Sequence, residues 1–70
     1  SRLCIVNRNV PNMVGQISTV IADAKLNIVD MTNKSRGDIA YTLVDVETAV
    51  ADETVEKIAA IDGVLSVRAI

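Results

Sequence analysis

The sequence of 70 residues contains no histidine, no tryptophan and no phenylalanine, and its one cysteine is Cys4. Without histidine, neither a Ser-His nor a Cys-His nucleophile pair can form. A single cysteine cannot form a disulfide within the chain, and with no histidine it cannot complete a zinc site of cysteine and histidine ligands. We therefore predict no catalytic residues of these classes and no metal site, and we interpret Cys4 as a small, buried apolar residue of a strand.

Glycine and aromatic residues are also scarce. The glycines Gly15, Gly37 and Gly63 lie far apart, so the chain has no glycine-rich phosphate loop. Tyr41 is the one aromatic residue, the net charge is −2, and the basic residues are scattered, which argues against nucleic-acid binding. No pair of acidic side chains is placed for acid–base chemistry, so we expect that the chain is not an enzyme by itself.

No apolar run approaches the about 18 residues of a membrane span. No secretory signal peptide opens the chain, and a lone cysteine is typical of a reducing compartment, so we expect a cytoplasmic protein with no membrane partner. Half of the residues are apolar, which predicts one folded domain over residues 1–70. The chain opens on strand-like residues without an initiator methionine, which predicts a C-terminal fragment of a larger enzyme.

The hydrophobic pattern predicts six elements in the order β-α-β-β-α-β. Apolar residues at helical spacing predict helices over 13–24 and 52–61, and short β-branched stretches predict strands over 2–7, 26–31, 39–47 and 64–70. Polar residues 33–38 predict a hairpin loop, and the two mostly apolar faces of 39–47 predict a central strand covered on both sides. This order predicts an α+β, ferredoxin-like sandwich: a four-stranded antiparallel sheet with both helices on one face.

The polar turn of residues 7–12, between the first strand and the first helix, is the most informative segment. It contains three asparagines, Asn7, Asn9 and Asn12, together with Pro11, which suits the first turn of a helix. A helix N-terminus attracts anions, and amide side chains both donate and accept, a mixture that fits a zwitterionic amino acid. The alternative that the residues leave open is that Asn9 or Asn12 only caps the helix.

Asn27 is a second unusual residue, because it opens the second strand, where asparagine is disfavoured. Two interpretations remain open. Asn27 is either a turn residue at the exit of the first helix, or an amide that projects from the open edge of the sheet into an interface with another chain.

The order and spacing of these segments resemble the ACT domain, a small-molecule sensing module of amino-acid metabolism. The resemblance is carried by Asn9-Val10-Pro11, by Ile17 and Ile21, by Leu26-Asn27-Ile28 and by residues 63–68. Residues 9–16, 27–31 and 40–45 are similar in particular to the C-terminal regulatory domains of D-3-phosphoglycerate dehydrogenases. This resemblance implies a parent enzyme that uses NAD in the first committed step of serine synthesis. It also implies homodimeric pairing through the second strand and inhibition by L-serine bound at that seam.

Carried over to this chain, the resemblance implies that Asn9 holds the ligand from the first loop and that Asn27 reaches it from the partner chain. The candidate ligand-binding residues are Asn7, Asn9, Pro11, Asn12, Met13 and Asn27. No cofactor is expected within these 70 residues, since NAD belongs to the parent enzyme. The alternatives are an ACT domain that senses another amino acid and a structural dimerisation module without a ligand.

Two positions depart from the family pattern. The family often has histidine where this chain has Asn7, and its usual Pro-Gly step is here Pro11-Asn12. Because glycine allows a close approach of the backbone to a ligand, Asn12 is expected to narrow the pocket.

Overall fold

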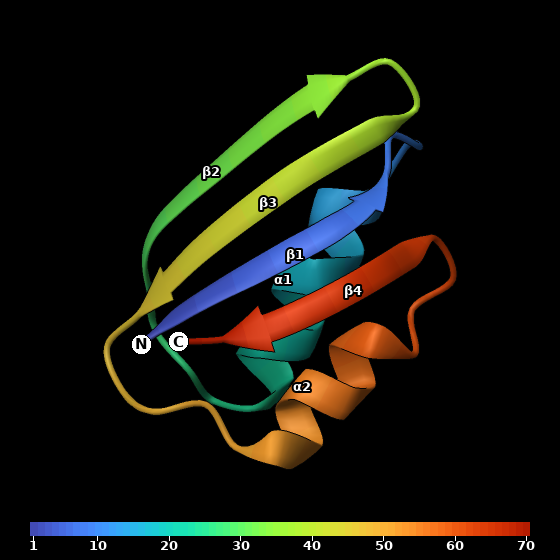
Figure 1. The fold of residues 1–70 in the computed structure, drawn as a ribbon. Coiled ribbons are helices and arrows are strands. Elements are labelled where there is room, and N and C mark those ends of the chain that lie inside the picture. Colours follow the sequence, from blue (N-terminus) through green and yellow to red (C-terminus); the bar gives the residue numbers. More distant parts are fainter.

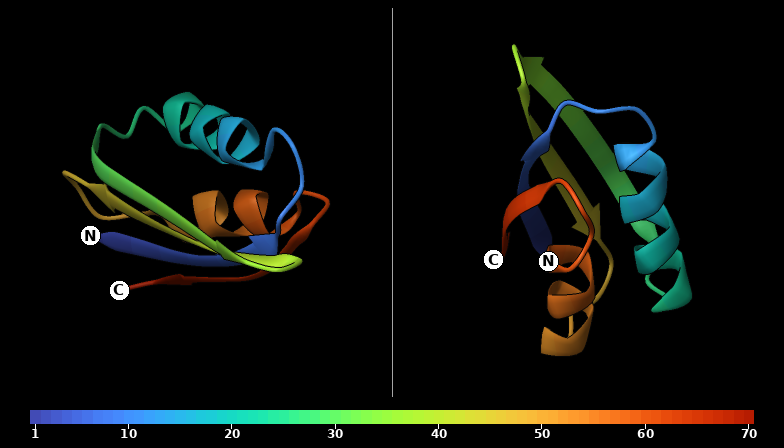
Figure 2. Two further views of the ribbon diagram at one scale, coloured as in Figure 1. Left: turned by 90° about the horizontal axis from the view of Figure 1, so that it is seen from above. Right: turned by 90° about the vertical axis from the view of Figure 1, so that its right-hand side faces the viewer.

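The computed structural model describes residues 1–70 and contains all six predicted elements. They are β1 (Arg2–Arg8), α1 (Met13–Asp23), β2 (Ile28–Arg36), β3 (Ile39–Val46), α2 (Asp52–Ala59) and β4 (Val64–Ala69). The strands form one antiparallel sheet in the order β2-β3-β1-β4 (Figure 1). Both helices cover the same face of the sheet (Figure 2). The predicted ferredoxin-like sandwich is therefore confirmed.

The hydrophobic core lies between the two helices and the sheet. α1 contributes residues at helical spacing, and β1 and β3 contribute alternate residues, because these periods place side chains on one face. The largest fully buried apolar side chains are Leu3, Ile5, Ile17, Ile21, Val44 and Ile58. The opposite face of the sheet carries no helix, and Tyr41 is 51% exposed there. The prediction that 39–47 is covered on both faces is thus wrong within this chain, because two right-handed crossovers place both helices on one side.

The hairpin between β2 and β3 is shorter than predicted. Residues 33–36 continue β2, and only Gly37 and Asp38 form the turn. Gly37 has a φ of +64°, in the region that two-residue hairpin turns require. Polar residues are tolerated in β2 because it is an edge strand with one neighbour. As a result, β2 presents an open edge nine residues long.

The bare face of the sheet carries a bidentate ion pair between Arg2 and Asp45. Arg2 Nε lies 2.8 Å from Asp45 Oδ1, and Arg2 Nη2 lies 3.2 Å from Asp45 Oδ2. The hydrogen bond from Arg2 holds the pKa of Asp45 below its ordinary value. Because the pKa is lowered by folding, this pair stabilises the fold above the ordinary carboxyl pKa, and the stabilisation disappears as the pH falls through the folded pKa.

We therefore expect Asp45→Asn to lower the melting temperature slightly at neutral pH, since the pair is exposed and screened. The difference between the variant and the unaltered protein is expected to shrink as the pH falls through the lowered pKa of Asp45, where the carboxylate becomes protonated. Thermal unfolding followed across this pH range measures both curves. If the difference in melting temperature between the two proteins stays constant as the pH is lowered, the ion pair is not the cause of that difference.

Candidate ligand-binding site

Asn7 anchors the start of the first loop from inside the fold. Its side chain is 1% exposed; its Nδ2 donates to the Arg8 carbonyl at 2.9 Å, and its Oδ1 accepts from the Thr42 hydroxyl at 3.0 Å. The Thr42 hydroxyl in turn accepts from Asn33 Nδ2 at 2.8 Å. This polar row crosses the sheet from β1 through β3 to the edge strand β2. The side chain of Asn7 therefore fixes the loop and does not face the loop surface.

Asn9 ties the first loop to the hairpin between β2 and β3. Its backbone N–H donates to the Asp38 carbonyl at 2.7 Å, and its Nδ2 donates to the Gly37 carbonyl at 3.1 Å. Asn9 is exposed, and its Oδ1 makes no hydrogen bond within the chain. The interpretation that Asn9 only caps the helix is wrong, because Asn12 holds the N-cap position and the Oδ1 of Asn9 accepts no helix N–H. Its free oxygen is available as an acceptor at the surface.

Asn12 takes the N-cap position of α1 in a left-handed conformation, with φ 66° and no hydrogen bond from its side chain to the helix. Asn12 therefore occupies the cap position without making the side-chain hydrogen bond of a cap. Asparagine tolerates the left-handed region better than most residues, which explains how it replaces the expected glycine. Its side chain lies over Gly15, where an added Cβ would be 2.5 Å from Asn12 Oδ1. Pro11 lies in the turn before Asn12, outside the first helical turn where we predicted it.

The first turn of α1 offers free backbone donors. The amides of Met13, Val14 and Gly15 have no acceptor within the chain, and the first bond of the turn runs from Gln16 N to the Asn12 carbonyl at 3.0 Å. Met13 itself is 3% exposed, so it can present only its backbone N–H to a ligand. Its side chain lies against the turn before β4, where a Cβ added to Gly63 would be 2.6 Å from Met13 Cε. Together these amides form an electropositive helix end suited to a carboxylate.

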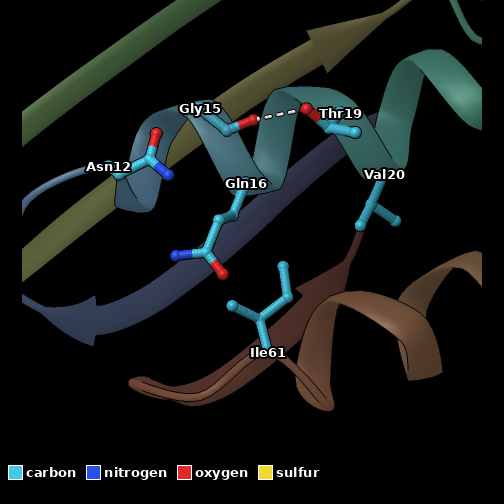
Figure 3. Close-up of a pocket in the computed structure, with 6 residues that line it drawn as sticks. All are labelled: Asn12, Gly15, Gln16, Thr19, Val20 and Ile61. Carbon is cyan, nitrogen blue, oxygen red and sulfur yellow. Dashed lines mark hydrogen bonds between the residues drawn. The ribbon is translucent and has the colours of Figure 1, made fainter.

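A hollow of about 380 Å³ opens beside this helix end (Figure 3). It is lined by Asn12, Gly15, Gln16, Thr19, Val20 and Ile61. In Figure 3 the Gln16 amide extends from α1 towards Ile61, in the turn after α2. Sequence reasoning missed Gln16, Thr19 and Ile61, because the hollow exists only where the end of α2 approaches α1. The one local signal was Gly15, a glycine within a helix.

Asn27 lies at the opposite end of the sheet from Asn9. It is exposed, and its carbonyl accepts from the Glu47 N–H at 3.2 Å, just before β2 begins. Asn9 is bound to the hairpin at the far end of β2, and a strand of nine residues spans about 30 Å. Asn9 and Asn27 of one chain therefore cannot contact the same small ligand.

Comparison with known proteins gives a consistent result. No protein-family profile matches the chain. The crystal and solution structures of the ACT domain from GTP pyrophosphokinase of Chlorobium tepidum superpose with TM-scores of 0.81 and 0.78, each at 21% identity and over 99% of this chain. They are covered over 94% and 82% of their own lengths. The chain has the ACT-domain fold.

A sequence relative of this ACT-fold chain is D-3-phosphoglycerate dehydrogenase of Haemophilus influenzae, which is 31% identical over 67 residues. The match covers 96% of this chain and 16% of the length of that enzyme. Neither helix of the ACT fold is long and apolar enough to cross a membrane. No three acidic or cysteine side chains gather as potential metal ligands.

Proposed function

We propose that this ACT-fold domain is the amino-acid-sensing regulatory domain of a longer, NAD-dependent D-3-phosphoglycerate dehydrogenase, and that its effector is L-serine. The observation that carries this proposal is the 31% identity to such an enzyme over nearly the whole chain. The match covers 16% of that enzyme, so catalysis and NAD binding are assigned to the remainder of the parent protein. The domain itself acts by binding the effector and changing how copies associate.

The chemistry of the first loop supports an amino-acid effector. The free amides of Met13, Val14 and Gly15 suit its carboxylate, and the free Oδ1 of Asn9 suits its ammonium group or hydroxyl. The positive end of α1 favours the carboxylate further, because the helix dipole concentrates there. A zwitterion of the size of serine satisfies both kinds of group without a charged side chain.

The open edge of β2 supports pairing with a second copy. If β2 pairs in antiparallel fashion with the same strand of the partner and Thr32 lies on the two-fold axis, Asp30 lies opposite the partner's Lys34. The partner's Asn27 then comes close to Gly37, whose carbonyl holds Asn9. The pairing thus brings together the two asparagines that lie at opposite ends of a single chain.

Calorimetric titration of the purified protein with L-serine tests the proposal. We expect measurable binding, and we expect Asn9→Ala to weaken it by about tenfold through loss of the Oδ1 acceptor. Asn12→Gly is the matched control, because glycine adopts the left-handed conformation without strain. The affinity of this variant for L-serine should not fall. Absence of both heat and thermal shift at millimolar L-serine would remove the sensing role.

A ligand-free dimerisation module is the second candidate function. It is favoured by one observation: the donors of Asn9 already hold the hairpin, which gives this residue a structural use. If Asn9→Ala lowers the melting temperature of the protein without effector and serine does not bind, the structural role is the correct one. Titration with other amino acids distinguishes a domain that senses a different effector.

A further inference from the structure

We infer that Asp30 and Lys34 determine the register in which β2 pairs with β2 of a second copy. This inference rests on the proposed pairing of two copies and specifies the side chains that select one alignment of the strands. Three features of β2 carry it: the direction of its backbone groups, the present bond of Asp30, and the order of charges along the strand.

The turn between β2 and β3 fixes which backbone groups face the open edge. Arg36 and Ile39 flank the two-residue turn as direct partners, so they exchange hydrogen bonds, and alternate residues of β2 follow the same pattern back to Asp30, where the register with β3 shifts. The backbone groups of Asp30, Thr32 and Lys34 therefore point to β3. Those of Met31, Asn33 and Ser35 point outward and are available to another strand.

Asp30 covers one of these outward amides. Its Oδ1 accepts from the Met31 N–H at 3.0 Å, although Met31 has a cross-strand partner, Val44, on β3. A charged side chain on an edge amide is one means by which sheets resist uncontrolled pairing. No side chain accepts from the outward amides of Asn33 or Ser35. Pairing at this edge therefore requires that Asp30 exchange the Met31 amide for another partner.

The order of charges along β2 supplies that partner. Asp30 is the only acidic residue of β2, and its basic residues are Lys34 and Arg36. With Thr32 on the two-fold axis, Asp30 lies opposite the partner's Lys34, and the symmetry repeats the pair. These positions are non-hydrogen-bonded pairs of the new ladder, where Cα atoms approach to about 4.5 Å and side chains contact most closely.

The neighbouring alignments fit less well. The helices of both copies lie on one face of the joined sheet only if residues of the same face lie opposite each other. The nearest alternative alignments that meet this condition place the two-fold axis at Met31 or at Asn33. With the axis at Met31, Asp30 faces Thr32, and Lys34 faces an apolar residue, Ile28. With the axis at Asn33, Asp30 faces Arg36, but Lys34 faces Thr32, and the partner's Asn27 moves about two residues past Gly37, away from the carbonyl that holds Asn9.

In the alignment centred on Thr32, the Met31 amide binds the partner's Asn33 carbonyl, and the carboxylate of Asp30 turns to the partner's Lys34. The side chain of Asp30 thus occupies an outward amide of the edge strand in the single copy, and it selects the register in the pair. Because both charges lie on the exposed face, the association is expected to weaken as salt is added.

Sedimentation equilibrium of charge-exchanged variants tests this inference, with circular dichroism as the check that each variant folds. Asp30→Lys and Lys34→Asp are each expected to raise the dimer dissociation constant about tenfold, since each sets like charges opposite each other twice. The double variant Asp30→Lys with Lys34→Asp should return to within about threefold of the unaltered protein. Asp30→Lys with Arg36→Asp is the matched control and should not recover.

The outcomes separate the register from the proposed function. The register is overturned if dimer affinity recovers when Asp30→Lys is combined with Arg36→Asp, or if it recovers in neither double variant. In both cases the proposed pairing still stands as long as the unaltered protein forms a dimer. If the unaltered protein is monomeric at every concentration, with and without L-serine, both the register and the proposed pairing are overturned.

Discussion

Replacing Ile17 with alanine is expected to lower the free energy of unfolding by about 2–5 kcal/mol. Ile17 is 0% exposed and lies at the middle of the apolar face of α1, between Met13 and Ile21. Its removal leaves a cavity that neighbouring side chains of the sheet cannot fill without strain. A chain of 70 residues is stabilised by about 4–10 kcal/mol in total, so this one change removes a large part of it.

Urea denaturation at one fixed protein concentration measures the effect, because association with a second copy would otherwise shift the midpoint. Val14→Ala is the matched control: it also truncates a β-branched residue of α1, but Val14 is 37% exposed. We expect this control to change stability by less than about 0.5 kcal/mol. Equal losses for the two variants would contradict the placement of α1 on the sheet.

Replacing Thr42 with valine is the second change with a large expected effect, about 1–3 kcal/mol of lost stability. Valine has nearly the same shape as threonine but removes the hydroxyl that donates to Asn7 and accepts from Asn33. Asn7 is 1% exposed, so its oxygen cannot turn to water, and the desolvation cost of that group is not recovered. Asn33 is exposed and can bind water instead.

Chemical denaturation of Thr42→Val beside Thr42→Ser distinguishes the hydroxyl from the packing. Serine keeps the donor and acceptor and loses one methyl group, which costs about 1 kcal/mol. If the valine variant is as stable as the unaltered protein, the polar row from β1 to β2 contributes nothing beyond filling space. A double variant of Thr42→Val with Asn7→Leu should recover part of the loss, because no buried polar group is left without a partner.

The two anchors of the first loop suggest how effector binding and chain pairing influence each other. Asn7 connects the loop to β2 through Thr42 and Asn33, and Asn9 connects it to the hairpin at the end of β2. A ligand that recruits Asn9 acts on the same strand that forms the proposed seam. By linkage, an effector that strengthens pairing must itself bind more tightly to the pair, by the same factor.

Several features of the candidate site could not be predicted because they depend on contacts between distant residues. The partner of Asn9 is Gly37, 28 positions away, and it becomes available only because the hairpin turn is short. The left-handed conformation of Asn12 depends on Gly15, whose missing Cβ leaves room for the Asn12 side chain. The hollow beside α1 depends on where the turn after α2 comes to lie.

The order of the six elements, the apolar face of each helix and the ferredoxin-like topology could all be predicted from the amino-acid sequence. These follow from periods of two and 3.6 residues and from the handedness of the crossovers, which are local properties of the chain. Three features could be learned only from the folded chain: residues 33–36 are strand, Asn7 is buried, and Asn9 and Asn27 lie at opposite ends of one sheet. Those outcomes depend on hydrogen bonds between strands, whose partners are selected by packing and not by neighbours in sequence.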